Sequence, residues 1–258
     1  MSAQQKLFIA SRENKRIAVV VEAAHPQKGM AFVMHGLGGS KTQMHIRTFI
    51  NTFKENGYTV VSFDTTNTFG ESDGNYEDAT TTNYLSDLED VISWSAEQKW
   101  YMEPFVLCGH SLGGLCTGLF AEKNQKKVKA LAPLATTVSG TLSMKHQNQE
   151  ELKQWKETGW QIKKSSSIPN ITKKLKWSHM EDRMNHDLLK HVDKLTMPTI
   201  LIVGEKDEST PPIMQKILFD KLPGKKEMHI IKNAEHGFKE KEQLSEVKSI
   251  LNNWVRSI

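Results

Sequence analysis

The chain has 258 residues, 38% of them hydrophobic, and its 34 basic and 30 acidic side chains give a formal net charge of +4. This length is enough for one large α/β domain with a substantial buried core, so a single domain is the first interpretation. So small a charge does not indicate nucleic-acid binding, and no apolar run approaches the ~18 residues of a membrane-spanning helix. The chain also starts without a secretory-type segment, and we therefore expect a cytoplasmic protein with no membrane span.

The charge is concentrated in one part of the sequence. Residues 121–176 contain 12 lysines and 4 acidic residues, a local net charge of +8 that leaves −4 for the rest of the chain. Such a surplus is most often a solvated face, but it is also able to attract an anionic substrate or an acidic surface. The sequence leaves both interpretations open.

The predicted elements begin with two apolar runs at residues 6–11 and 17–22, separated by "RENKR", which predict an antiparallel hairpin. Continuous apolar runs follow, typical of strands buried on both faces of a parallel sheet. They cover residues 30–35, 59–64, 105–110, 128–134, 199–204 and 227–232. Apolar residues at helical spacing lie between them at 46–53 and 84–92 and after them at 244–254. This alternation predicts an α/β fold with a mostly parallel eight-stranded sheet and helices on both faces.

Residues 136–191 interrupt the alternation. They contain no convincing strand pattern, and helical patterns flank the breaker "SSSIPN". We interpret them as a helical cap insertion over one end of the sheet, with residues 1–135 and 192–258 forming the core.

Large side chains are frequent in this insertion, among them Trp155, Trp160 and Trp177. They are candidates for lining an acyl or aryl pocket. The alternative, which we favour for at least half of the large cap side chains, is that they fasten the cap to the core.

One spacing in the insertion resembles a metal site. His179, Asp182 and His186 would share one helical face, but the closely paired i, i+4 histidines of a zinc helix are missing. We therefore predict a solvated cap helix and no metal site.

A serine stands at the end of the run at 105–110, in the stretch "CGHSLGG". Ser111 satisfies the pattern G-x-S-x-G, in which the glycines leave room for a sharp turn from strand to helix. The start of the following helix favours developing negative charge, although a plain serine N-cap would fit the same pattern. Cys108 and Cys116 flank the serine, and we expect two buried free thiols because they define no disulfide framework.

A second glycine-rich stretch, "HGLGG" at residues 35–39, directly follows the run at 30–35. It resembles the oxyanion loop of the α/β-hydrolase superfamily, in which this loop and the residue after the nucleophile each supply one backbone donor. By position, the resemblance implies the N–H groups of Leu37 and Leu112. A phosphate-binding turn is the weaker alternative, because G-x-G-x-x-G and a Walker lysine are both missing.

In this superfamily the acid and the base follow the serine along the chain. Asp207 lies three residues past the end of the strand run at 199–204, with Glu205 and Glu208 as less favoured substitutes. His236 lies just past the last predicted strand. The order and the strand ends together select Ser111, Asp207 and His236 as the catalytic residues.

The whole chain, from the opening hairpin to the last helix, resembles an α/β hydrolase. The stretch at residues 63–74 is similar to the D-x-x-G-x-G-x-S stretch of esterase, lysophospholipase-like and serine-aminopeptidase-like members. Asp64, Gly70, Ser72 and Gly74 fit it, but the frequent arginine is missing. A serine nucleophile argues against the dehalogenases and epoxide hydrolases of similar fold, which attack with aspartate.

The resemblance implies hydrolysis of a carboxylic ester with a small to medium acyl or aryl group through an acyl-enzyme, without a metal or organic cofactor. An acyl-CoA thioesterase or a serine peptidase would use the same residues. A ligand-binding relative with weak turnover is a further alternative. The sequence indicates neither the natural substrate nor the oligomeric state.

Overall fold

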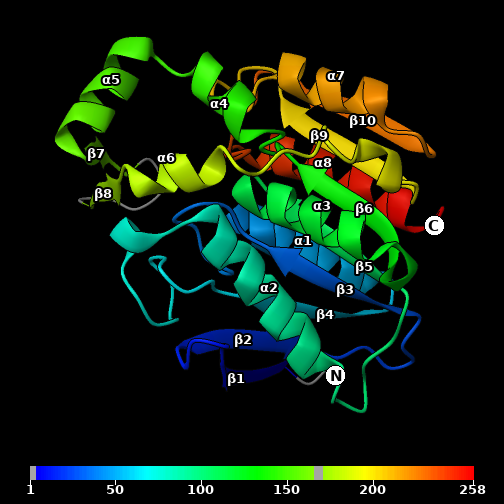
Figure 1. Cartoon of the computed structure of the whole chain (residues 1–258). Coiled ribbons are helices and arrows are strands. Elements are labelled where there is room, and N and C mark those ends of the chain that lie inside the picture. Colours follow the sequence, from blue (N-terminus) through cyan, green and yellow to red (C-terminus); the bar gives the residue numbers. More distant parts are fainter. Residues whose placement is uncertain (1–3, 166–170) are drawn as a thin grey trace.

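The computed structural model describes residues 4–165 and 171–258, and a single eight-stranded sheet forms their centre (Figure 1). The strand order is β1-β2-β4-β3-β5-β6-β9-β10. Strand β2 pairs antiparallel with β1 and β4, and the other neighbours are parallel. The bounds are β1 (Gln4–Ala10), β2 (Arg16–Glu22), β3 (Gly29–Met34), β4 (Tyr58–Phe63), β5 (Phe105–His110), β6 (Val128–Leu134), β9 (Thr199–Gly204) and β10 (Lys226–Ile231). The predicted opening hairpin and mostly parallel sheet are confirmed.

Two hydrophobic cores lie on opposite faces of the sheet. In β3, Met30, Phe32 and Met34 belong to one core, and Ala31 and Val33 belong to the other. Since side chains alternate along a strand, a strand covered on both faces has a continuous apolar sequence. The first core includes helices α2 (Thr81–Ser95), α3 (Leu112–Lys123) and α7 (Pro212–Lys221), and the second includes α1 (Met44–Glu55) and α8 (Lys241–Val255).

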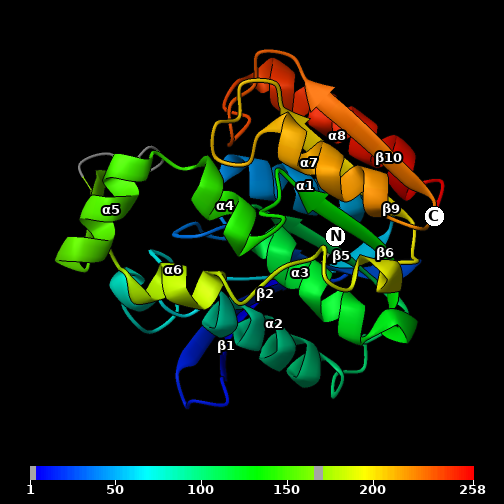
Figure 2. The same ribbon diagram turned by 45° about the horizontal axis from the view of Figure 1, so that its top comes forward.

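The segment between β6 and β9 stands at one side of the sheet in both views (Figures 1 and 2). It contains the helices α4 (Gly140–His146), α5 (Gln149–Thr158) and α6 (Ser178–Arg183). It also contains an antiparallel hairpin of β7 (Trp160–Lys164) and β8 (Thr172–Lys176), which the sequence did not indicate. These strands are mostly exposed and rich in lysine, so they lack the apolar pattern of a buried strand.

Short 3₁₀ turns complete the described elements: η1 (Tyr76–Asp78), η2 (Gln125–Lys127) and η3 (Val192–Lys194). Cys108 and Cys116 are buried and unpaired, as expected. Within the described ranges, every helix is too short or too polar to cross a membrane.

Candidate active site

Ser111 occupies the turn between β5 and α3 in a conformation that non-glycine residues rarely adopt. Its φ is 56° and its ψ is −119°. Positive φ in a residue with a side chain is strained, and such strain persists only where the surroundings enforce it. Here the Ser111 N–H donates to Leu134 O at 3.0 Å, and the Ser111 carbonyl accepts from the N–H of Thr137 at 3.1 Å. Strand β6 and the residues after it therefore hold the turn from one side.

The glycines of the motif are required by close backbone approach. A Cβ on Gly109 would lie 2.3 Å from the carbonyl oxygen of Gly113. A Cβ on Gly113 would lie 2.4 Å from the carbonyl oxygen of His35, in the glycine-rich loop after β3. Any larger residue at either position would push the helix away from the strand ends. The pattern G-x-S-x-G therefore brings the Ser111 turn against the loop that follows β3.

Asp207 and His236 contact each other at the ends of β9 and β10. His236 Nδ1–H donates to Asp207 Oδ2 at 2.8 Å. Asp207 Oδ1 accepts from the N–H groups of Ser209 and Thr210, each at 2.9 Å. Burial would raise the pKa of Asp207, but these hydrogen bonds and His236 outweigh it and lower the pKa below its usual value. The carboxylate therefore stays ionised and fixes the His236 tautomer that leaves Nε2 able to accept a proton.

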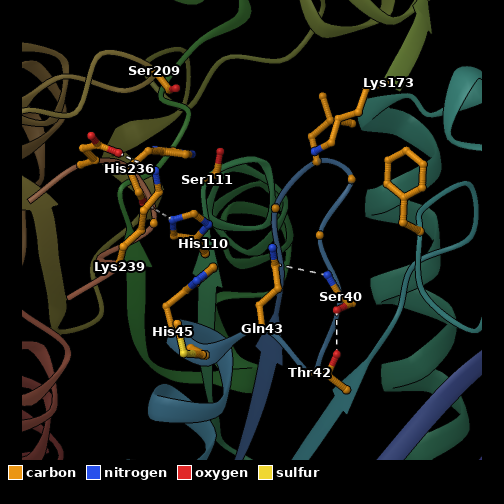
Figure 3. Close-up of a pocket in the computed structure, with 18 of the residues that line it drawn as sticks. Ser40, Thr42, Gln43, His45, His110, Ser111, Lys173, Ser209, His236 and Lys239 are labelled. Atoms are coloured by element: carbon orange, nitrogen blue, oxygen red, sulfur yellow. Dashed lines mark hydrogen bonds and ion pairs between the residues drawn. The ribbon is translucent and has the colours of Figure 1, made fainter. Parts of the chain in front are cut away.

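A pocket of about 1100 Å³ is lined by both Ser111 and His236 (Figure 3). Within the described part of the chain, no hydrogen bond joins the Ser111 hydroxyl to His236. Catalytic hydrogen bonds are often long before substrate binds, so this geometry is compatible with a nucleophile and its base.

Two unused backbone donors lie beside the serine. Among the hydrogen bonds of the described residues, none has the N–H of Leu37 or Leu112 as its donor. Farther along the loop, the N–H of Gly38 donates to Tyr84 Oη at 3.1 Å and that of Gly39 to Gly36 O at 3.0 Å. Both donors that the resemblance implied for an oxyanion are therefore available to an acceptor, and their role stays a prediction.

A buried histidine stabilises this loop. His35 Nδ1–H donates to Gly36 O at 2.7 Å, and His35 Nε2 accepts from Thr65 N–H at 3.1 Å. Burial lowers the pKa of His35, so the ring is neutral and both of its nitrogens are used. His35 thus connects the loop after β3 to the chain after β4.

Two further histidines pack behind His236. His110 Nε2–H donates to the carbonyl oxygen of His236 at 2.8 Å, and their ring centroids are 4.7 Å apart. The ring of His45 packs on His110 at 4.4 Å. Burial lowers the pKa of His110 and brings that of His45 to about 3, so both rings are neutral neighbours of His236. His110 lies in the G-x-S-x-G motif, which assigns it no role, and no motif surrounds His45, so the sequence selected neither histidine.

The loop at residues 64–74 is anchored by a buried charge pair. Lys41 Nζ contacts Asp64 Oδ2 at 2.5 Å, and Asp64 Oδ1 accepts from the Lys41 N–H at 2.8 Å. Ser72 Oγ donates to Asp64 O at 2.6 Å, and a Cβ on Gly70 would lie 2.3 Å from Asp64 Cγ. The residues that fit the superfamily stretch therefore stabilise the loop.

The three tryptophans of the insertion lie away from the pocket lining that the described residues form. Trp155 is buried, its ring centroid lies 5.5 Å from that of Trp177, and its Nε1–H donates to Leu175 O at 3.0 Å. Trp160 is partly exposed at the start of β7, beneath the ammonium of Lys176. Their contacts are packing contacts. The insertion residue that does line the pocket is Lys173.

The prediction of a solvated helix at His179 is wrong. His179 is fully buried, its Nδ1–H donates to Ala79 O at 2.8 Å, and its Nε2 accepts from Arg183 Nη2 at 2.6 Å. Asp182 contacts Thr82 instead. Across residues 4–165 and 171–258, no group of three histidine, cysteine or acidic side chains is arranged to hold a metal ion.

The fold and the arrangement at the strand ends define an α/β hydrolase. A family model described as PhoPQ-activated pathogenicity-related protein matches residues 82–258, and the chain belongs to that family.

Curated relatives agree with the superfamily. The chain is 28% identical over 191 residues to the mitochondrial palmitoyl-protein thioesterase ABHD10 of Bos taurus. That match covers 73% of this chain but only 60% of the bovine protein. An uncharacterized 31.7 kDa protein of Escherichia coli is 23% identical, over 82% of this chain and 83% of its own.

Solved structures share the fold over almost the whole chain. Est1E from Butyrivibrio proteoclasticus with bound ferulic acid has a TM-score of 0.83 at 19% identity, covering 97% of this chain and 98% of its own. Mouse ABHD10 has a TM-score of 0.80 at 20% identity, covering 98% of this chain and 99% of its own. These two likenesses show that the chain shares the fold of both proteins.

Proposed function

We propose that the protein is a serine hydrolase that cleaves a carboxylic ester or thioester through an acyl-enzyme on Ser111. The observation that carries this proposal is the 2.8 Å contact between His236 Nδ1 and Asp207, beside a pocket that Ser111 and His236 both line. The strained turn at Ser111 is a second supporting observation.

In the proposed mechanism, His236 Nε2 accepts the proton of the Ser111 hydroxyl while the oxygen attacks the substrate carbonyl. The N–H groups of Leu37 and Leu112 stabilise the oxyanion. His236 then protonates the leaving group, which departs as an alcohol or thiol. Water, deprotonated by the same imidazole, releases the acid from the acyl-enzyme. Asp207 stabilises the imidazolium in both steps without taking the proton.

We include both esters and thioesters among the proposed substrates because similar proteins are described as acting on or binding compounds related to each. The ABHD10 proteins are described as palmitoyl-protein thioesterases, and Est1E holds ferulic acid, an aromatic acid.

We also propose that residues 136–191 act as a cap on the core formed by 1–135 and 192–258. The pocket position of Lys173, in this segment, supports a contribution of the cap to substrate selection.

The test is labelling by a fluorophosphonate followed by peptide mapping, together with turnover of paired p-nitrophenyl esters, acyl thioesters and anilides. We expect the label on Ser111 and no turnover by Ser111→Ala. Ser209→Ala is the matched control, because it removes another hydroxyl of the pocket but keeps the N–H that donates to Asp207. A label elsewhere, or equal activity in Ser111→Ala, would contradict the proposal. Preference for the anilide would indicate a peptidase.

A further inference from the structure

Among the residues that the structure describes, Lys173 is a cation in the wall of the pocket that has no counterion. It comes from β8, its side chain is only partly exposed, and it lines the same pocket as Ser111 (Figure 3). In the described part of the chain, no carboxylate lies within ion-pair distance of its Nζ. Burial lowers the pKa of the Lys173 ammonium, since charge loses solvation there.

The position of this ammonium is well defined. Its Nζ lies 5.6 Å from the ring centroid of Phe69 and 5.7 Å from that of Tyr76. The two rings are stacked, with centroids 4.7 Å apart and planes 25° from parallel. A Cβ on Gly38 would lie 3.3 Å from Lys173 Nζ, so the ammonium stands against the oxyanion loop. Aromatic faces attract a cation but do not neutralise its charge.

Three nearby lysines have a carboxylate partner, whereas Lys164, Lys174 and Lys206 have none among the described residues but are exposed, unlike Lys173. In the same hairpin, Lys163 pairs with Glu151 and Lys176 pairs with Asp78. Lys239, on the far side of the pocket, pairs with Glu235 at 2.7 Å. A partly buried charge that lacks a partner loses solvation that a ligand of opposite charge can replace. We therefore expect the substrate to supply the negative charge that pairs with the Lys173 ammonium.

The pocket also indicates which half of the substrate carries that partner. The other charged lining residues, Lys206, Glu208, Glu235 and Lys239, belong to the segments around Asp207 and His236. In Figure 3, Ser111 is seen between His236 on one side and Lys173 on the other. Because His236 protonates the leaving group, the leaving group belongs on its side. The acyl half then extends toward Lys173.

We propose that Lys173 is a specificity residue that binds a carboxylate at the far end of the acyl group. The substrate class is thus the monoester or monothioester of a dicarboxylic acid. This inference rests on the proposed function and names its substrate more closely. One ammonium matches the single charge of a carboxylate better than a phosphate dianion, which usually gathers several donors.

The test compares p-nitrophenyl hydrogen adipate, which carries a free carboxylate on the acyl half, with its neutral methyl ester. For Lys173→Met we expect kcat/KM on the acid to fall about 10- to 100-fold, the range of a hydrogen bond to a charged group. The methyl ester should stay within about twofold, because no charged contact is lost. Lys173→Arg should keep most of the preference. Lys174→Met is the matched control, since Lys174 is exposed on the same strand and lies outside the pocket lining.

Equal loss on both esters in Lys173→Met would overturn the inference and leave the proposed function standing. A Lys173-dependent preference for 4-acetoxybenzoate over its methyl ester would overturn the acyl-half assignment, since that carboxylate is on the leaving group. Binding of monomethyl adipate to Ser111→Ala, measured by calorimetry, separates the two proposals. If the parent protein hydrolyses no ester, but monomethyl adipate binds and Lys173→Met abolishes this binding, the Lys173 site is supported and the proposed function is refuted. No binding and no preference would refute the site.

Discussion

Replacing Asp207 by asparagine tests the proposed charge arrangement without emptying the site. Oδ1 of the asparagine can still accept from Ser209 N–H and Thr210 N–H, which now lie 2.9 Å from the carboxylate. The new amide can donate to Thr210 Oγ1, whose own hydroxyl already donates to Ala135 O at 2.8 Å. Since these hydrogen bonds survive, we expect the free energy of unfolding to change by no more than about 1 kcal/mol.

The effect on catalysis should be much larger. The amide would also donate to His236 Nδ1, which now donates to the carboxylate across 2.8 Å. That reversal places the imidazole proton on Nε2. Because Nε2 is then a donor, it cannot accept the proton of the Ser111 hydroxyl. Holding the wrong tautomer costs about 10⁴ in kcat in other serine hydrolases, equivalent to ~5 kcal/mol of transition-state stabilisation.

The assay is kcat for p-nitrophenyl butyrate, with the melting temperature recorded for each variant. Asp207→Ala should lose activity and also melt earlier, because two backbone donors lose their acceptor at about 1–3 kcal/mol each. Glu208→Gln and Glu205→Gln are the carboxylate controls and should stay within about twofold, since neither carboxylate contacts His236. If Asp207→Asn kept kcat within tenfold while either control abolished it, the acid would have to be reassigned.

Further predictions concern pH, backbone room and the cap. Burial raises the pKa of Asp87 to about 7, so the free energy of unfolding should fall as pH rises from about 4 to 7. Between pH 5 and pH 8 this fall should be about 3 kcal/mol in the parent, and denaturant unfolding should show that Asp87→Asn lacks it. Gly113→Ala should lower both the melting temperature and kcat, because its Cβ meets a carbonyl oxygen at 2.4 Å, whereas Gly237→Ala has open space and should melt like the parent. Trp155→Ala should lower the free energy of unfolding by about 3–5 kcal/mol, measured with denaturant, because the ring is buried. The ratios of kcat/KM between short, medium and aromatic esters should stay unchanged. Trp160→Ala should lower the free energy of unfolding far less, because Trp160 is 37% exposed. A changed substrate ratio in Trp155→Ala would show that this ring reaches the substrate.

The sheet could be predicted because burial on both faces imposes continuous apolar runs. The six predicted central strands agree with the observed ones to within a residue at each end. Strands β7 and β8 could not be found in this way, because they are mostly exposed and their sequences, "WQIKK" and "TKKLK", contain no continuous apolar run. The exposure of the helix around His179 was predicted wrongly because its sequence is polar. His179 is nevertheless buried, where its Nδ1–H donates to a backbone carbonyl oxygen.

The site was predictable where close contacts between backbone segments restrict the residue type. Close backbone contacts force glycine at positions 109 and 113, so Ser111 could be found from its neighbours. Asp207 and His236 followed from strand ends, and the structure brings them into contact, while their catalytic roles stay predictions. Lys173 could not be selected, because the sequence does not distinguish it from Lys174 beside it. Aromatic content likewise could not decide between tryptophans that line a pocket and tryptophans that fasten the cap; in the structure Trp155 packs against Trp177, and Trp160 is partly exposed.

In the proposed function, the fold separates the residues that carry out the chemistry from the residue that selects the substrate. Parallel strands present their carboxyl ends at one edge of a sheet, and there β3, β5, β9 and β10 lead into the oxyanion loop, Ser111, Asp207 and His236. Residues that begin at buried strand ends are held by the two cores and cannot shift without disturbing them. Lys173 instead stands on an exposed hairpin, whose sequence can change at little cost to the sheet. Variants of the strand ends should therefore lower kcat for every substrate, whereas variants of Lys173, the hairpin residue that lines the pocket, should change the ratio between substrates.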